Sequence, residues 1–177
     1  MFFIPGIIIS IVTFPGVIVH ELAHQLFCRW FKVSVFEVCY FRFENPVGYV
    51  IHEPAPKSYQ TILISVGPFI INTIIAFLVA FPAAMQYKFG DANGFDYILL
   101  YLGVSIGAHA FPSTGDAQSL WDSTMKSEDT SLLVKIIVAP IVGFIYLGAL
   151  GSFFWLDIAY GIAVSSGLPY LVIKMLS

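Results

Sequence analysis

The chain has 177 residues, of which 58% are hydrophobic and 11% are charged, with a formal net charge of −3. A soluble domain carries about 25% charged residues, so this composition excludes an ordinary soluble protein and indicates an integral membrane protein, as does the mean hydropathy of +0.86. The small negative charge gives no sign of nucleic-acid binding, and the two cysteines cannot form a disulfide framework.

Long apolar runs predict an all-α, polytopic membrane protein, folded as one membrane-embedded domain over residues 1–177 with the lipid bilayer around it. A helix needs about 20 apolar residues to cross a hydrocarbon core about 30 Å thick, and several stretches of the chain meet or approach that length. About five spans are expected, covering residues 2–31, 58–85, 95–112, 132–150 and 153–175.

Residues 33–52, between the first two expected spans, have the composition of β-structure. Val33 to Phe43 is rich in β-branched and aromatic residues, and the turn-forming segment Glu44 to Gly48 precedes a second short apolar run. Apolar residues fall on both faces of the strands, which suits an element lying in the membrane interface. We therefore expect a β-hairpin or small sheet at the membrane surface.

The first expected span contains an H-E-x-x-H motif, His20-Glu21-Leu22-Ala23-His24. Side chains four residues apart lie on one face of a helix, so His20 and His24 can bind one zinc ion while Glu21 acts as general base on a zinc-activated water. The alternative is a pair of hydrogen-bonded core histidines beside a buried carboxylate. Ionisable groups inside a membrane are costly and usually mark functional sites, which favours the metal.

A third ligand should come from the end of the third expected span. Pro112 and Gly115 should break the helix, so that Asp116 projects from irregular backbone, which membrane depth tolerates only inside protein or beside a cavity. We expect Asp116 to bind zinc; the alternative is that it caps a helix starting at Ala117. His109 is the rival ligand, and we expect it instead to be a polar catalytic group facing the reacting carbonyl.

Asn72 lies near the middle of the second expected span. A buried amide in a membrane needs a hydrogen-bond partner. Two roles are open for it: binding the backbone of a substrate, or forming a hydrogen bond between helices.

The basic residues predict how the chain is oriented in the membrane. If the N-terminus lies outside, seven of the eight lysines and arginines fall on the inner side, and Lys88 alone falls outside. We therefore expect a multi-pass protein with an outside N-terminus and a metal site near the cytoplasmic face. The same arrangement brings the H-E-x-x-H motif and Asp116 to one side of the membrane.

These motifs resemble those of the site-2 protease family of intramembrane zinc metalloproteases. The resemblance implies one zinc ion per chain, bound by the two histidines and the aspartate with the glutamate as base, and cleavage of transmembrane segments to release membrane-tethered regulators. The chain departs from the family pattern in three ways. Gly115-Asp116-Ala117 stands where the family has Leu-Asp-Gly, and Asn72 follows Gly67-Pro68 one residue later than in the family's Gly-Pro-x-x-Asn. No PDZ domain is present, so the chain resembles a compact, divergent member. The resemblance covers about residues 10–120 and rests on His20-Glu21-x-x-His24, on Gly67-Pro68 followed by Asn72, and on Pro112 followed by Asp116.

The expected function is hydrolysis of peptide bonds in or near transmembrane segments of membrane proteins. Such a substrate must unwind before cleavage, and a strand edge of the 33–52 hairpin could hold it by β-augmentation. The alternatives are a non-proteolytic metal-binding or transport protein, a catalytically silent adaptor that binds transmembrane segments, and a zinc protease that cleaves lipidated C-termini. Glu21 argues against the first two, because neither needs a base beside the metal.

Overall fold

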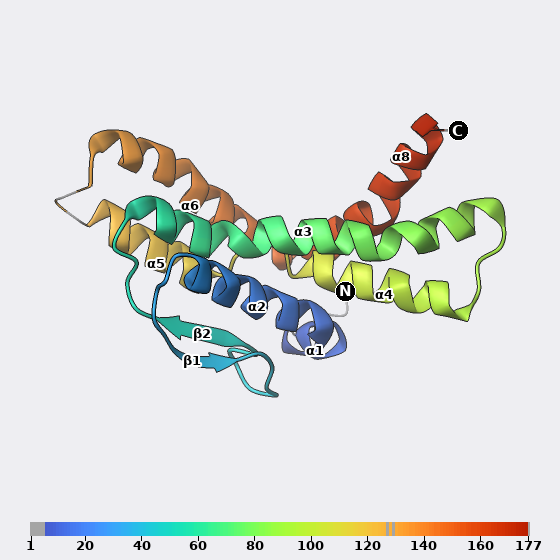
Figure 1. Ribbon diagram of the computed structural model, residues 1–177, viewed down its shortest axis with the longest axis horizontal. Helices are drawn as coiled ribbons and strands as arrows, with labels where there is room; N and C mark the ends of the chain where they lie inside the picture. Colours follow the sequence, from blue (N-terminus) through green and yellow to red (C-terminus); the bar gives the residue numbers. More distant parts are fainter. Residues whose placement is uncertain (1–5, 127, 129, 177) are drawn as a thin grey trace.

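The computed structural model of the chain describes residues 6–126, 128 and 130–176. The fold is mostly helical, with 74% of residues in helices and one small sheet. The elements in chain order are α1 (Gly6–Val12), α2 (Phe14–Trp30), β1 (Val35–Cys39), β2 (Tyr49–His52), α3 (Ser58–Phe89), α4 (Gly94–Ala108), α5 (Thr114–Met125), α6 (Leu132–Ser152), α7 (Leu156–Ile162), the π-helical turn η1 (Ala163–Gly167) and α8 (Leu168–Leu176). Figure 1 shows α3 running along the length of the molecule, with α5, α6 and the sheet towards one end and α4 and α8 towards the other.

In the part of the chain that the structure describes, three helices are long and apolar enough to cross a membrane: α3, α6 and the segment 156–176, which joins α7, η1 and α8. The pair α1 and α2 would make a fourth span only if taken together, and α4 is an apolar helix of 15 residues. These helices agree with a membrane protein, but they do not confirm the expected count of about five spans. The predicted orientation of the chain across the membrane stays a prediction.

The first expected span is not a single straight helix, because α1 and α2 meet at an angle of 88°. The bend lies at Thr13, and Pro15 follows in the first turn of α2, where a missing N–H is tolerated. Side chains of α4 bind the backbone carbonyls at the bend: the Tyr101 hydroxyl donates to Val12 O over 2.6 Å, and the Ser105 hydroxyl donates to Thr13 O over 2.8 Å. The bend is therefore held by contacts with another helix.

Helices α3 and α4 form an antiparallel pair. The backbone turns at Gly90, which has a φ of 81° that glycine adopts without steric cost, and Asn93 then caps α4 by accepting the N–H of Phe95. Small residues let the helices approach closely, since a Cβ at Gly103 would lie 2.7 Å from the Cβ of Ala80. This pairing carries the C-terminal end of α4 back to the middle of α3.

The segment after the expected third span is helical, whereas the sequence predicted irregular backbone at Asp116. Ser113 is the N-cap of α5 and accepts the Asp116 N–H over 3.2 Å, so Asp116 lies in the first turn of a helix that extends to Met125. The alternative placement of Asp116 as the N-cap is therefore wrong as well. A Ser-x-x-Asp spacing is a helix-start signal, and it outweighed the polar composition that follows.

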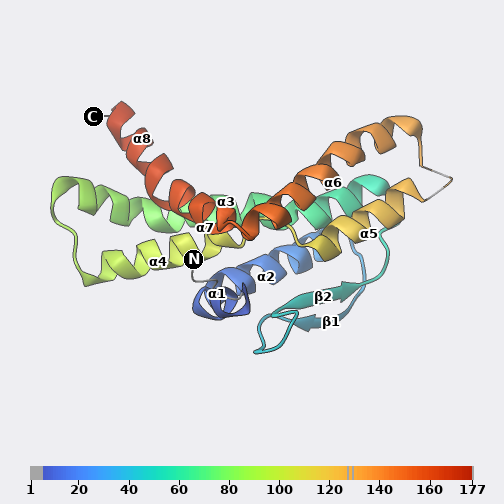
Figure 2. The same cartoon turned by 180° about the vertical axis from the view of Figure 1, so that it is seen from behind.

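Strands β1 and β2 pair antiparallel and confirm the small sheet predicted within residues 33–52. The register pairs Cys39 with Tyr49 and Val38 with Val50, and an irregularity follows between Val35 and Glu37. In both views β1 is the outer strand and β2 lies nearer the helices (Figures 1 and 2).

The buried apolar side chains form three clusters that tie the helices together. One joins α2 to α3, one joins α3 to α4 and η1, and one joins α5 to α6. Cys28 is fully buried in the first cluster, as expected for a cysteine that packs as a small apolar residue. The clusters contain Phe27, Cys28, Val33 and Ile64; Ala76, Ile106 and Val164; and Ala117, Leu120, Val138, Val142 and Ile145.

Gly16 provides a test of the contact between α2 and α4. A Cβ at this position would lie 2.0 Å from the backbone oxygen of Ser105, so we expect Gly16→Ala to lower the free energy of unfolding by about 2 kcal/mol or more. The measurement is reversible unfolding in detergent micelles. Gly143→Ala in α6 is the matched control: no atom lies within 4 Å of its Cβ position, and alanine favours the helix by up to about 1 kcal/mol. Equal stability of the two variants would contradict the packing argument.

Candidate metal centre

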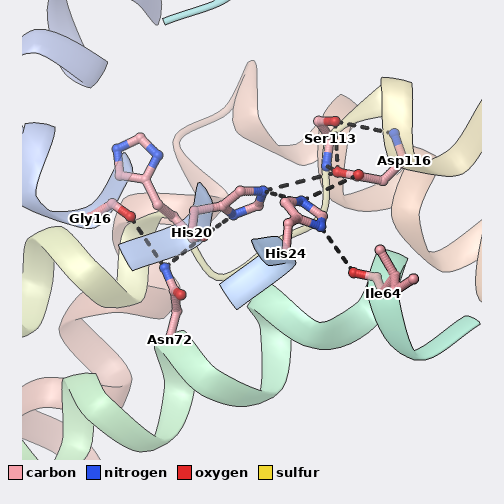
Figure 3. Close-up of polar contacts among 8 residues, drawn as sticks. Gly16, His20, His24, Ile64, Asn72, Ser113 and Asp116 are labelled. Carbon is pink, nitrogen blue, oxygen red and sulfur yellow. Dashed lines mark hydrogen bonds and ion pairs between the residues drawn. The ribbon is translucent and has the colours of Figure 1, made fainter. Parts of the chain in front are cut away.

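His20 and His24 lie one turn apart on α2, and their rings point to the same place (Figure 3). Nδ1 of His20 lies 2.7 Å from the carbonyl oxygen of His109, and Nδ1 of His24 lies 2.9 Å from that of Ile64. A carbonyl only accepts hydrogen bonds, so both Nδ1 atoms carry the proton, and in a neutral ring Nε2 then presents its lone pair. The two Nε2 atoms are 3.2 Å apart, where two facing lone pairs repel each other unless a cation lies between them.

Asp116 brings a carboxylate from α5 to this pair of nitrogens. Its Oδ1 lies 3.3 Å from Nε2 of His24, and its Oδ2 lies 3.9 Å from Nε2 of His20. One donor atom from each residue falls within 4.8 Å of the others. Donor atoms around a tetrahedral zinc ion with bonds of about 2.0–2.1 Å lie roughly 3.3 Å apart. Two imidazole nitrogens and one carboxylate oxygen at these distances fit a zinc ion.

Ser113 holds the Asp116 carboxylate in place. Its N–H and its hydroxyl both donate to Oδ2 of Asp116 over 2.7 Å, which leaves Oδ1 facing His24 (Figure 3). Burial disfavours the ionised carboxylate, but His24 and His20, in their positively charged forms, and the Ser113 hydrogen bonds lower the pKa of Asp116 below its usual range. Ser113 was not predicted from the sequence, although its Ser-x-x-Asp spacing is the signal of a capping box.

Glu21 lines a cleft of about 410 Å³ together with His20. Residues 45–48, just before β2, form one wall of this cleft. A Cβ at Gly48 would lie 2.8 Å from Cγ and 2.9 Å from Oε1 of Glu21, so only glycine lets the loop pack this closely on the glutamate. Nothing in the sequence beyond the turn composition of 44–48 pointed to Gly48 as a neighbour of the motif.

His109 contributes its backbone to the metal centre, while its ring points elsewhere. Its Nε2 lies 2.8 Å from the Thr13 hydroxyl, which itself donates to Ile9 O, so Nε2 is the donor in this contact. His109 is also one of the residues that line the cleft. Among the described residues the ligand group consists of His20, His24 and Asp116, and a catalytic role for the His109 ring stays a prediction.

Asn72 is fully buried on α3, where its side-chain amide joins three helices. Its Nδ2 lies 3.3 Å from the carbonyl oxygen of Gly16 (Figure 3). It also lies 3.1 Å from the carbonyl oxygen of Ile106 and 3.0 Å from that of His109. These contacts match the helix–helix hydrogen bond considered for Asn72, and the substrate contact stays a prediction. The amide also supports the same His109 carbonyl that orients His20.

Comparison with known proteins places the chain in a family. The family model described as "Putative zincin peptidase" (DUF3267) matches residues 13–116, and the chain belongs to this family. The matched region runs from the bend before α2 to Asp116, so it includes the H-E-x-x-H motif and all three candidate ligands. Neither the curated proteins nor the solved structures include a match to this chain. Family and site together indicate a zinc metallopeptidase.

Replacing Ser113 tests whether the cap of α5 also orients a metal ligand. We expect Ser113→Ala to weaken zinc binding by about 10–100-fold, as is typical when a partner of a metal ligand is lost, measured by competition with a chelator in detergent. Ser131→Ala is the matched control, because Ser131 caps α6 in the same way by accepting the N–H of Val134. If both variants lose the same zinc affinity, helix capping alone explains the effect.

Proposed function

We propose that this zinc metallopeptidase is an intramembrane endopeptidase of the site-2 protease type, which hydrolyses peptide bonds in or near transmembrane segments. One observation carries the proposal: donor atoms of His20, His24 and Asp116 converge, and the His20 of this group lines a cleft together with Glu21. Apolar helices line this cleft through Ile9 of α1, Val17 of α2 and Ala149 of α6, and α6 is long enough to cross a membrane.

In this proposal His20, His24 and Asp116 hold the zinc ion. Bound zinc supplies Lewis acidity, which lowers the pKa of water towards 7 and polarises a peptide carbonyl. Glu21 follows His20 on the same helix and lines the same cleft, so it takes the proton of the attacking water and delivers it to the leaving amine. The carbonyls of His109 and Ile64 keep both imidazoles in the tautomer that presents Nε2.

The arrangement of β2 supports a transmembrane substrate that binds as an added strand. β2 pairs with β1 along one edge, and a groove of about 550 Å³ lies between β2 and α5, lined by residues 50–52 and by Ser119, Asp122 and Ser123. An unwound segment in this groove would form main-chain hydrogen bonds with β2. Residues 45–48 directly precede β2 and line the cleft with Glu21, so the same segment would lead to the metal centre.

The decisive test is cleavage of transmembrane peptides by the zinc-loaded protein in proteoliposomes. We expect wild type to bind about one zinc per chain and to cleave, and Glu21→Gln to keep the zinc but lose activity by at least about 100-fold, because the proton acceptor is gone. The matched control, Glu53→Gln, changes an exposed carboxylate and should keep both properties.

Other outcomes of this experiment identify the alternatives. Zinc-dependent metal flux that survives Glu21→Gln would identify a metal transport protein. Cleavage of prenylated C-terminal peptides in place of transmembrane peptides would identify a different zinc protease. A wild-type protein that binds transmembrane peptides but no zinc would be an adaptor.

Strand addition is tested by removing a backbone N–H from β2. The Glu53 N–H donates to Ser34 O of the β1 side, and N–H directions alternate along a strand, so the Val50 N–H faces the groove. We expect Val50→Pro to lower cleavage by about tenfold or more, because proline cannot donate to an added strand, while zinc content stays unchanged. Val50→Ile keeps the N–H and serves as the control. Cleavage by Val50→Pro at the wild-type rate would rule out this mode of substrate binding.

A further inference from the structure

His24 depends on a backbone acceptor in the middle of another helix. Its Nδ1 lies 2.9 Å from the carbonyl oxygen of Ile64, and both residues are buried, at 6% and 2% exposure. Ile64 is the seventh residue of α3, which continues to Phe89. Inside an α-helix each carbonyl normally accepts the N–H of the residue four positions later, so this acceptor should already be occupied.

The residue four positions after Ile64 is Pro68, which has no N–H. α3 continues without interruption from Ser58 to Phe89 with Pro68 inside it. The Ile64 carbonyl therefore lacks its helical donor, and a buried carbonyl without a partner is costly. The His24 N–H supplies that partner.

Gly67, beside Pro68, brings the two helices within reach of each other. A Cβ at Gly67 would lie 2.3 Å from Cδ2 of Phe27, which is one turn after His24 on α2. Only glycine allows α2 to lie this close to α3. The Gly67-Pro68 pair thus combines a close approach of the helices with a free acceptor at the point of contact.

His20 uses an acceptor of the same kind. The His109 carbonyl lies at the C-terminal cap of α4, where carbonyls have no donor in their own helix. Each candidate histidine ligand therefore binds a backbone carbonyl that has no donor within the carbonyl's own helix. For His20 this carbonyl lies at the end of α4, and for His24 it lies four residues before a proline in α3.

We infer that Pro68 is a positioning residue of the metal centre: by removing one N–H from α3 it frees the Ile64 carbonyl, which fixes His24 in the tautomer that binds zinc through Nε2. The inference adds a residue to the proposed zinc site and rests on it. The common role of a helix proline is to bend the helix, and that role alone predicts no effect on the His24 tautomer or on zinc affinity.

Pro68→Ala restores an N–H that competes with His24 for the Ile64 carbonyl. We expect zinc affinity to fall by about 10–100-fold, measured by chelator competition, while the metal-free protein stays folded by circular dichroism and gel filtration. Pro82→Ala is the matched control, because Pro82 lies in the same helix away from the histidines, and it should keep the wild-type zinc affinity. Unchanged affinity in Pro68→Ala, or equal losses in both variants, would overturn the inference.

A backbone substitution separates the missing N–H from the shape of the proline ring. Lactic acid at position 68, introduced in place of proline as the ester analogue of alanine, has neither ring nor N–H. We expect it to recover most of the zinc affinity that Pro68→Ala loses. If it binds zinc as weakly as Pro68→Ala, the ring and not the free carbonyl matters, and the inference fails. If Pro68→Ala folds poorly, the lactic acid variant still tests the inference, because its zinc affinity can be compared directly with that of wild type.

Nitrogen-15 chemical shifts of the histidine rings in the metal-free protein provide a readout independent of zinc. We expect His24 to be protonated at Nδ1 in wild type and in Pro82→Ala, and to become a mixture of tautomers in Pro68→Ala. An unchanged tautomer in Pro68→Ala would contradict the inference whether or not the protein cleaves peptides. If wild type binds no zinc but the His24 tautomer still changes in Pro68→Ala, the proposed function is refuted, while the effect of Pro68 on the His24 tautomer is supported.

Discussion

The metal centre depends on the close contact of α2 with α4 at Gly16. Because no side chain separates the two backbones there, the Gly16 N–H reaches the Ser105 hydroxyl and the Gly16 carbonyl comes within 3.3 Å of the Asn72 amide. The same approach puts the end of α4 beside His20, whose ring the His109 carbonyl then orients. A larger residue at position 16 would separate the helices at the point where the ligand geometry is set.

Polar groups at this contact are costly to bury, and most of them are satisfied by one another, whereas Oδ1 of Asn72 has no hydrogen-bond partner among the described residues. Ser105 accepts from one residue at the bend and donates to another, and Asn72 is shared among three carbonyls. Networks of this kind specify one arrangement of helices, because a shift of any member leaves a buried donor or acceptor unpaired. Van der Waals packing of apolar helices in lipid would not by itself select that arrangement.

The cleft combines parts of the chain that lie far apart in sequence. It is lined by residues of α2, of the loop before β2 and of α1, and by residues 149, 152 and 157 near the junction of α6 and α7. The C-terminal helices therefore contribute to the cleft that Glu21 lines. The match to the zincin peptidase family covers residues 13–116, so α1 and the C-terminal residues of the cleft lie outside the matched region.

The sequence alone determined what depends on local composition and periodicity: the membrane class, the apolar helices near 58–85 and 132–150, the hairpin within 33–52, and the placement of His20 and His24 on one helix face. It did not determine the 88° bend or the partners of Asn72 and His109, since these depend on contacts between residues tens of positions apart. The helix that carries Asp116 has a local start signal at Ser113, but it was not predicted. Gly-Pro at 67–68 was visible as a motif, but its geometry became interpretable only once α2 lay against α3. Periodicity assigns a residue to a face of its helix, whereas the neighbour of that face is decided by the packing of the whole chain.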